Sequence, residues 1–328
     1  MSRFFYHLSA IMILLAVTIL PTVSSDVKHP GKTYLASSSG AYGNRVPIWS
    51  KNVKVPYRSW IPLDKPHVVL LCVHGLGFSS ESFSEFGRSM AGHGFAVYAL
   101  DVRGFGQWMQ RQDDKVDFEG CMSDVEAALR SLRKVYPGLP VFLVGESMGG
   151  AIALQATSRN PQLVDGLVCS VPSSDRYAKL SSELIVGTRY LENKDKPMDI
   201  SAEVVNRTTA SPKLRKEWKN ESTNRMKLSP RELKQFSDFM KGNDDAAVLI
   251  DKTPTLMLAG FKDKLVKPEG TIELFNDLSY QDKLLMVVGD GEHLLFEENQ
   301  MTAQLEQLVI DWVKNESGAR PRGVTAHP

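Results

Sequence analysis

The sequence predicts an α/β fold in which a mostly parallel sheet carries helices on both faces and one helical insertion. Short runs of Val, Leu and Ile alternate along the chain with longer amphipathic stretches. Continuous apolar runs are typical of parallel strands buried on both faces, and the alternation of strand and helix favours a parallel sheet. The alternation stops between residues 173 and 248, where charged and apolar residues mix without a strand. The 328 residues are therefore expected to form one large core with an insertion.

The core is expected to cover residues 26–172 and 249–315. Its first part, "VPIWSKNVKVPYRSWIP", alternates and carries prolines, which suits an antiparallel edge of the sheet. The parallel strands are predicted in "HVVLLCVHG", "GFAVYALD", "PVFLVGES", "LVDGLVCSVP", "TPTLMLAG" and "KLLMVVGD". The helices between and after them are predicted at residues 82–93, 118–135, 148–158, 268–278 and 301–314.

The insertion, residues 173–248, is predicted to be a helical cap. Within it, "SPRELKQFSDFMKG" has Ser229 and Glu232 as a capping box and Pro230 at the first helical position. Gly242 is expected to end this helix.

Apolar residues on one face of the same helix have two interpretations that the sequence leaves open. They either pack onto the main domain or form a wall over the active site. In the second case the apolar side chains of the cap would line an acyl tunnel, among them Leu184, Ile185, Val186, Leu233, Phe236 and Met240.

The N-terminus, residues 1–25, is predicted to be a secretory signal peptide. It has one early cation, Arg3, then an apolar run from Leu8 to Leu20, then small residues up to Ser25. The apolar run is shorter than the roughly 20 residues that span a bilayer, so an uncleaved membrane anchor is the second choice. The expected location is secreted, periplasmic or luminal. At the other end, residues 316–328 are polar and are expected to form a flexible tail.

Charge and cysteine content exclude several functional classes. The 39 Lys and Arg residues nearly balance the 38 Asp and Glu residues, which removes a general electrostatic case for binding nucleic acid. The three cysteines, Cys72, Cys121 and Cys169, are expected to be buried thiols, and no pair of them has metal-ligand spacing. No metal and no cofactor is expected.

The stretch "FLVGESMGGAIAL" places Ser147 between glycines at a predicted strand-to-helix turn. This G-x-S-x-G context is that of a nucleophile elbow, where small neighbours let the flanking chains approach a strained central residue. The motif also occurs by chance in loops. A serine hydroxyl becomes a good nucleophile only when a base takes its proton and a carboxylate orients that base. The presence of these partners therefore decides whether Ser147 is catalytic.

His293 is the predicted base. Of the seven histidines, only His74 and His293 come directly after a strand, and only His293, in "VVGDGEHLLF", follows the last one. In a doubly wound sheet the partners of the serine come from loops at the carboxyl ends of later strands. The alternative is a surface loop histidine.

Asp263 is the predicted acid because "LMLAGFKDKLV" places it shortly after the preceding strand, which gives the chain order Ser, Asp, His. Asp290 and Glu292 are the competitors. They flank His293 in its own loop, where folding back onto the ring is harder. Asp263 could also be a loop charge that aids solubility, given a lysine on either side.

Acyl transfer also needs N–H donors for the developing oxyanion. Met148, directly after the serine, is expected to supply one, and Leu76, in the glycine-punctuated loop "VHGLG", the second. His74 is expected to fasten that loop rather than to catalyse. In "DVRGFGQW", Asp101, Arg103, Gly104 and Gly106 are expected to be scaffolding for the next loop.

Five motifs in order, "VHGLG", "DVRGFG", "GESMGGA", "GFKDKLV" and "GEHLLFEE", resemble the monoacylglycerol lipase-like branch of the α/β-hydrolases, which is lysophospholipase-like and serine aminopeptidase S33-like. The resemblance runs from about Val46 to Val313 and includes the position of the cap. It implies the same triad and the same two oxyanion donors. Many members have His where Glu146 stands, and "GESMGGA" also looks like the variant in relatives that cleave hydroxycinnamoyl esters in plants.

The resemblance implies a serine hydrolase that acts on monoacylglycerol, lysophospholipid or related carboxylic esters, with contact to a membrane surface as a further expectation. An esterase for soluble aromatic or short-chain esters is the alternative. A non-catalytic ligand-binding protein on the same scaffold is the remote alternative, because fold alone does not set function.

Overall fold

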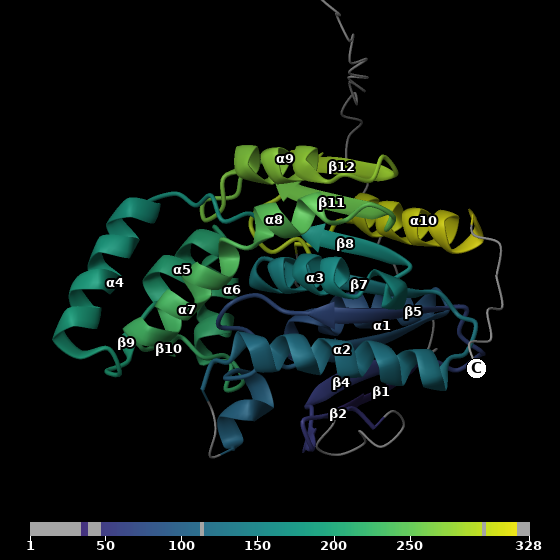
Figure 1. Cartoon of the computed structure of the whole chain (residues 1–328), viewed down its shortest axis with the longest axis horizontal. Helices are drawn as coiled ribbons and strands as arrows, with labels where there is room; N and C mark the ends of the chain where they lie inside the picture. The colour runs from purple at the N-terminus through teal and green to yellow at the C-terminus, as the bar shows by residue number, and fades with distance from the viewer. Residues whose placement is uncertain (1–33, 39–46, 112–114, 297–299, 320–328) are drawn as a thin grey trace, which may run out of the picture. The chain divides into compact units, whose positions relative to one another are not determined.

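A computed structural model describes residues 34–38, 47–111, 115–296 and 300–319, all in one compact unit. An eight-stranded sheet crosses this unit in the order β1-β4-β6-β5-β7-β8-β11-β12 (Figure 1). All neighbours from β6 to β12 are parallel. Strand β4 pairs antiparallel with β6, as the sequence predicted for residues 46–62, and β1 pairs antiparallel with β4. The strands are β1 (Tyr34–Ser38), β4 (Tyr57–Pro62), β5 (Val68–Val73), β6 (Phe95–Leu100), β7 (Val141–Glu146), β8 (Gly166–Ser170), β11 (Thr255–Gly260) and β12 (Lys283–Val288), with β2 (Trp49–Ser50) and β3 (Val53–Lys54) as a separate pair.

Helices cover both faces of the sheet, which confirms the predicted fold class. Along β5, Val68, Leu70 and Cys72 belong to one buried cluster with α1 and α10, and the alternate residues Val69 and Leu71 belong to another with α2, α3 and α9. This division follows from the two-residue period of a strand buried on both faces. The helices of these layers are α1 (Ser84–Gly92), α2 (Phe118–Val135), α3 (Met148–Arg159), α9 (Pro268–Asp277) and α10 (Ala303–Ala319), with short 3₁₀ turns η1 (Ser80–Phe83), η2 (Gly106–Gln110) and η3 (Pro161–Leu163).

Two expectations for the C-terminal part of the core are wrong. The run of β12 was expected to be buried on both faces, but Leu284 and Val287 are 42% and 41% exposed because β12 is the last strand of the sheet. Helix α10 continues to Ala319, so residues 316–319 are helical and the expected tail does not begin at residue 316.

Residues 173–248, called the insert below, follow β8 and contain five helices. Four of them, α4 to α7, gather beyond one end of the sheet, and α8 packs against α3 and α9 (Figure 1). The insert also holds two short paired strands, which corrects the expectation that it has none. Its elements are α4 (Lys179–Asn193), β9 (Met198–Asp199), α5 (Ser201–Thr208), α6 (Pro212–Asn220), β10 (Lys227–Leu228), α7 (Pro230–Met240) and α8 (Asn243–Val248).

Helix α7 begins as its sequence predicts. Ser229 accepts from the Glu232 backbone N–H, and the Glu232 carboxylate accepts in return from the backbone N–H of Ser229, at 2.8 Å. The helix ends at Met240, two positions before Gly242.

The predicted signal peptide or anchor, residues 1–25, lies outside the described residues, as does the tail beyond residue 319. Within the described ranges, no helix combines the length and the apolar character needed to cross a bilayer. The three cysteines are free and buried.

Candidate active site

Ser147 occupies a strained turn between β7 and α3. Its φ of 56° and ψ of −119° lie in a region that side chains other than glycine rarely adopt, and its N–H donates to the Ser170 carbonyl at 2.8 Å. Glycine is required on both sides of the turn. A Cβ on Gly145 would lie 2.1 Å from the Gly149 carbonyl oxygen, and one on Gly149 would lie 1.9 Å from the Val73 carbonyl oxygen. The two glycines therefore let α3 rise directly against β7 and β5.

Ser147, His293 and Asp263 form a continuous chain of hydrogen bonds. The Ser147 hydroxyl lies 2.8 Å from Nε2 of His293, and Nδ1 of His293 lies 2.7 Å from Oδ2 of Asp263. Because the carboxylate is an acceptor, the ring proton sits on Nδ1 and leaves Nε2 free to accept from the serine. Asp263 is held in turn by the N–H groups of Leu265 and Val266, which donate to its Oδ1 at 2.7 and 2.9 Å.

The two competing acids point elsewhere. Asp290 pairs with Lys262 at the surface, and its side chain is 90% exposed. Glu292 accepts from the Thr209 hydroxyl at 2.6 Å and from the Ala210 N–H at 2.7 Å. The structure therefore places only Asp263 against the ring of His293.

The two expected oxyanion donors lie in segments next to the serine. Met148 is the first residue of α3, where N–H groups have no partner within the helix. Gly75, the neighbour of Leu76, lies so close to the elbow that a Cβ on it would be 3.5 Å from Cβ of Ser147. His74 fastens this loop as expected. Its Nδ1 donates to the Gly75 carbonyl at 2.8 Å, and its Nε2 accepts from the Val102 N–H at 3.0 Å.

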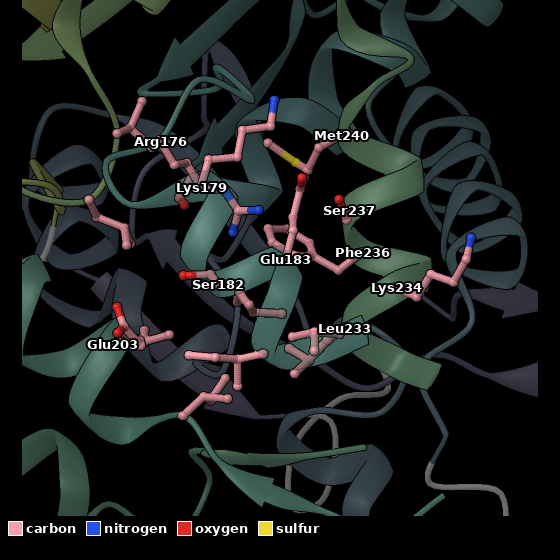
Figure 2. Close-up of a pocket in the computed structure, with 18 of the residues that line it drawn as sticks. Arg176, Lys179, Ser182, Glu183, Glu203, Leu233, Lys234, Phe236, Ser237 and Met240 are labelled. Atoms are coloured by element: carbon pink, nitrogen blue, oxygen red, sulfur yellow. The ribbon is translucent and has the colours of Figure 1, made fainter. Parts of the chain in front are cut away.

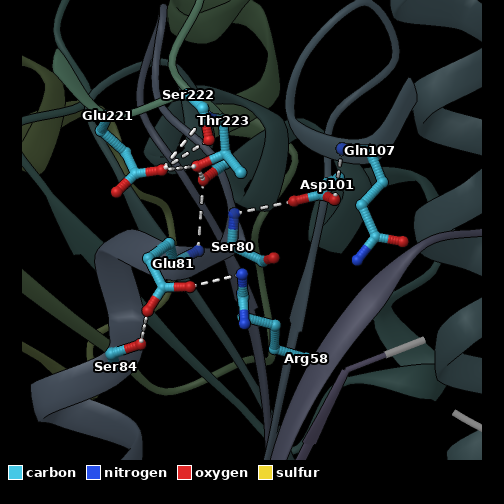
Figure 3. A network of polar contacts seen from close by, with 10 residues as sticks. Arg58, Ser80, Glu81, Ser84, Asp101, Gln107, Glu221, Ser222 and Thr223 are labelled. Carbon is cyan, nitrogen blue, oxygen red and sulfur yellow. Dashed lines mark hydrogen bonds and ion pairs between the residues drawn. The ribbon is translucent and has the colours of Figure 1, made fainter. Parts of the chain in front are cut away.

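A polar network supports the same loop through Asp101, which follows β6, and through residues of the insert (Figure 3). Asp101 accepts from the N–H groups of Ser80 and Gln107 at 2.8 and 2.9 Å, which matches its expected scaffolding role. From the insert, Thr223 shares a hydrogen bond with Ser79 at 2.9 Å. The Arg225 N–H donates to the Gly77 carbonyl at 2.7 Å. The insert is thus tied to the loop that carries Leu76.

The remaining expected scaffolding residues also hold loops in place. Arg103 makes a two-pronged ion pair with Asp124 of α2, with both N–O distances at 2.7 Å. Gly104 and Gly106 have φ values of 88° and 55°, and the Gly104 carbonyl accepts from the Arg225 guanidinium at 3.0 Å.

Glu146 is a residue of the site that the sequence analysis noticed only as a departure from the family pattern. Its Oε1 accepts from the N–H groups of Leu295 and Phe296, at 2.6 and 3.0 Å, and from the Ser170 hydroxyl at 3.2 Å. The carboxyl group therefore ties the loop of His293 to the end of β7. Burial raises the pKa of Glu146 from 4.5 to about 7, because these hydrogen bonds only partly offset the loss of water. No local signal in the sequence indicates this role, because Leu295 and Phe296 lie 149 and 150 residues further along the chain.

The insert holds the His293 loop from the other side. The backbone N–H of His293 donates to the Thr208 carbonyl at the end of α5, at 3.3 Å, next to the contacts of Glu292 with Thr209 and Ala210. His293 and Asp263 are 1% and 4% exposed, so both side chains are shielded from solvent.

A pocket of about 940 Å³ opens above Ser147 and His293 and extends between α4, α5 and α7. All of the apolar residues named for a tunnel line it, although they differ in exposure. Leu184 and Ile185 are 73% and 52% exposed, whereas Phe236 and Met240 are 5% and 4% exposed. Phe236 also packs toward Phe118 of α2, with ring centroids 6.5 Å apart. Both interpretations of the apolar face of α7 therefore apply: Phe236 lines the pocket and also packs toward the main domain. The lining residues in question are Leu184, Ile185, Val186, Leu233, Phe236 and Met240.

No cluster of three or more His, Cys, Asp or Glu side chains suited to a metal ion occurs in the part of the chain that the structure describes.

The sheet order, the serine at the end of β7 and its partners after β11 and β12 define the chain as an α/β-hydrolase. Solved structures agree with this class. A soluble variant of monoglyceride lipase from Saccharomyces cerevisiae, in complex with a substrate analog, superposes with a TM-score of 0.71. It covers 83% of this chain and 96% of its own at 18% identity, which shows the fold.

The family model described as serine aminopeptidase, S33, matches residues 64–300. The chain belongs to this family. Among the relatives, human monoglyceride lipase is 28% identical over 247 residues, which are 74% of this chain and 80% of the relative. Phospholipase YtpA of Bacillus subtilis is 24% identical over 241 residues, 72% of this chain and 91% of the relative. These similarities make the chain an enzyme of the carboxylic ester hydrolase class.

The role of Glu146 can be tested by comparing Glu146→Gln with Glu146→Ala. Between pH 4.5 and 7 the folded protein keeps a proton on Glu146 that the unfolded chain releases, so its contribution to stability falls as pH rises through this window. Gln keeps the acceptor and does not titrate. We expect the free energy of unfolding, measured in urea, to be the same for Glu146→Gln and the parent at pH 4.5. Above pH 7 we expect the value for Glu146→Gln to be higher by on the order of 2 to 3 kcal/mol.

Glu146→Ala leaves the N–H groups of Leu295 and Phe296 without a partner. We expect it to lower the free energy of unfolding by about 2 to 5 kcal/mol and kcat by about 10- to 100-fold, because His293 shares their loop. Parental kcat and stability in Glu146→Ala would contradict the anchoring role.

Proposed function

We propose that the chain is a serine carboxylic ester hydrolase that works through an acyl-enzyme, with Ser147 as nucleophile, His293 as base and Asp263 as acid. The observation that carries this proposal is the pair of hydrogen bonds from Ser147 to His293 and from His293 to Asp263, at 2.8 and 2.7 Å, on the floor of the pocket. No step of this chemistry needs a metal or an organic cofactor.

In the first half of the reaction, Oγ of Ser147 attacks the ester carbonyl carbon while Nε2 of His293 takes the hydroxyl proton. The carbonyl oxygen gains the negative charge, and the N–H groups of Leu76 and Met148 are proposed to stabilise it. His293 then returns the proton to the departing alcohol oxygen as the C–O bond breaks. In the second half, His293 takes a proton from water and the resulting hydroxide attacks the acyl carbonyl carbon. The acyl C–O bond to Ser147 then breaks, His293 returns the proton to Oγ of Ser147, and the carboxylic acid leaves.

The proposed substrates are monoacylglycerol or lysophospholipid-type esters. A pocket of about 940 Å³ with apolar residues from α4 and α7 on its walls suits a single acyl chain. The similarity to a monoglyceride lipase and to a phospholipase supports the same substrate class.

We also propose that α4 contacts a lipid surface. None of its side chains is buried in the protein, and Leu180, Leu184 and Leu191 are 83%, 73% and 88% exposed. Such apolar side chains on a helix at the rim of the pocket would be stabilised in the acyl region of a membrane or micelle.

Export through residues 1–25 stays a prediction, and the N-terminal sequence of the protein from a secreting host would test it.

Ser147→Ala is expected to lower kcat by about 10⁴- to 10⁶-fold in hydrolysis of a p-nitrophenyl ester, since the nucleophile is lost. Asp263→Asn is expected to reduce kcat by about 10⁴-fold through loss of the carboxylate that orients His293. Asp290→Asn is the matched control because Asp290 pairs with Lys262 at the surface. If Asp290→Asn loses kcat and Asp263→Asn does not, the assignment of the acid is wrong.

Acyl chain length tests the lipid substrate. Each methylene buried in the pocket contributes about 0.8 kcal/mol, so kcat/KM should rise roughly fourfold per carbon until the pocket is filled. A series of p-nitrophenyl esters from four to twelve carbons measures this slope. A flat or falling profile would reject the lipid proposal in favour of short-chain or aromatic esters.

Two variants separate the lining of the pocket from the core. Phe236→Ala is expected to cost about 3 to 5 kcal/mol of stability because Phe236 is buried against α2. Leu184→Ala is expected to change stability by less than about 0.5 kcal/mol and to lower kcat/KM for the longest esters only. Equal effects of Leu184→Ala on all chain lengths would remove Leu184 from the acyl site.

Binding to lipid vesicles tests α4. Replacing Leu180 and Leu191 together by Ser is expected to reduce co-sedimentation with phosphatidylcholine vesicles at least tenfold. It should leave the turnover of a soluble butyrate ester unchanged, because neither change touches the triad. Undiminished vesicle binding in this variant would rule out α4 as the contact surface.

A further inference from the structure

We propose that Arg176 forms a subsite for an anionic group, a phosphate or a carboxylate, which the ester substrate carries away from its scissile carbonyl. This inference rests on the proposed ester hydrolysis at Ser147 and narrows its substrate class from glycerol esters in general to those with a negative charge.

The backbone of Arg176 is fixed relative to the triad. It forms an antiparallel bridge with Val266, and the N–H of the next residue, Tyr177, donates to the Leu265 carbonyl at 3.1 Å. Leu265 and Val266 are the residues whose N–H groups hold the carboxylate of Asp263. The position of Arg176 is therefore set by the same loop that sets the acid of the triad.

The side chain of Arg176 lines the pocket without a counter-ion. Its guanidinium carbon lies 5.1 Å from the ring centre of Phe236, and its Nε is buried with no hydrogen-bond partner. Two threonine hydroxyls, of Thr157 and Thr271, are the other buried polar side-chain atoms without a partner in the described residues, and neither lines the pocket. A charged group left in this state is far more costly than a hydroxyl, so the position calls for a functional reason.

Most other charged side chains of the pocket are already paired. Lys234 and Lys241 both bind Asp238, at 2.5 and 3.0 Å, and Glu203 binds Arg207 at 3.0 Å. These pairs lie on α5 and near the C-terminal end of α7, and each has at least one exposed partner. Besides these pairs, the pocket is lined by three ionic side chains near the start of α4, namely Arg176, Lys179 and Glu183.

Figure 2 shows these three side chains facing Leu233, Phe236 and Met240 of α7 across the pocket. Glu183 favours the charged form of Arg176 electrostatically, yet across the described ranges no carboxylate lies within ion-pair distance of the guanidinium. Burial lowers the pKa of Arg176 from its usual value, but a guanidinium remains protonated at neutral pH. The local charge is thus two cations against one anion.

The chemistry of the group selects its ligand. A guanidinium presents its N–H donors in a planar fork that fits the oxygens of a phosphate or carboxylate. Such a bond strengthens where water is excluded, as on the face of Phe236. A neutral glycerol head group would offer hydroxyls but no counter-charge, so Arg176 favours the lysophospholipid-type branch of the proposed substrates.

Binding measured in the Ser147→Ala background tests the subsite independently of turnover. Octyl phosphate and octanoate are compared with octanol by calorimetry, which separates a phosphate ligand from a carboxylate ligand at equal chain length. We expect at least one anion to bind about 10- to 100-fold more tightly than octanol. Arg176→Met should abolish this advantage, and Lys234→Met, which removes a paired cation from the same pocket, should retain it.

Kinetics of the otherwise unchanged enzyme give the second arm. For 1-octanoylglycerol 3-phosphate relative to 1-octanoylglycerol, we expect Arg176→Met to lower the ratio of kcat/KM values at least tenfold and to change turnover of the neutral ester by less than about threefold. An anion advantage that survives Arg176→Met would place the anion elsewhere, for example at the oxyanion donors, and would overturn the proposal.

Thermal unfolding separates binding from structural support. Because Arg176→Met removes a partly buried charge whose Nε has no hydrogen-bond partner, its melting temperature should equal or exceed that of the parent. A lower melting temperature together with equal losses on neutral and anionic esters would show a structural role and contradict the subsite. If the parent hydrolyses neither ester, the proposed function fails, while the calorimetric comparison still decides the fate of the subsite.

Discussion

The strained turn at Ser147 is the constraint on which the rest of the site depends. A serine with φ of 56° is held there because β5, β7 and α3 approach so closely that no Cβ fits at Gly145 or Gly149. The turn directs the hydroxyl toward the loop that follows β12, where His293 lies at hydrogen-bond distance from it. Asp263, in the loop that follows β11, binds the other ring nitrogen of His293. Backbone strain of this kind persists only where surrounding packing over-determines it, and the buried sheet supplies that packing.

The loop of His293 is held by two different parts of the molecule. From the sheet side, Glu146 accepts the N–H groups of Leu295 and Phe296, and from the insert, the Thr208 carbonyl accepts the N–H of His293 itself. Because the insert also binds the loop of Leu76 through Arg225 and Thr223, it connects the proposed base, the proposed oxyanion donors and the walls of the pocket. Movement of the insert would therefore affect substrate access and the geometry of the base together.

Local patterns in the sequence predicted much of this architecture. The bounds of α2 and the start of α7 follow from periodicity and capping, and the order of the motifs around Ser147, Asp263 and His293 anticipates the hydrogen-bond chain. Tertiary context decided the rest. The exposure of β12 depends on its place at the edge of the sheet, and the contacts of Glu146 and the isolation of Arg176 depend on residues far away in the chain. No local pattern encodes such contacts.

The central claim is that an acyl group passes through Ser147. The most direct test is to quench the reaction with p-nitrophenyl octanoate in acid within milliseconds and to map the modified peptide by mass spectrometry. The account predicts an octanoyl group on the peptide that contains Ser147, formed as fast as the first turnover and lost at the steady-state rate. Turnover without any covalent adduct, or an adduct on a different residue, would contradict it.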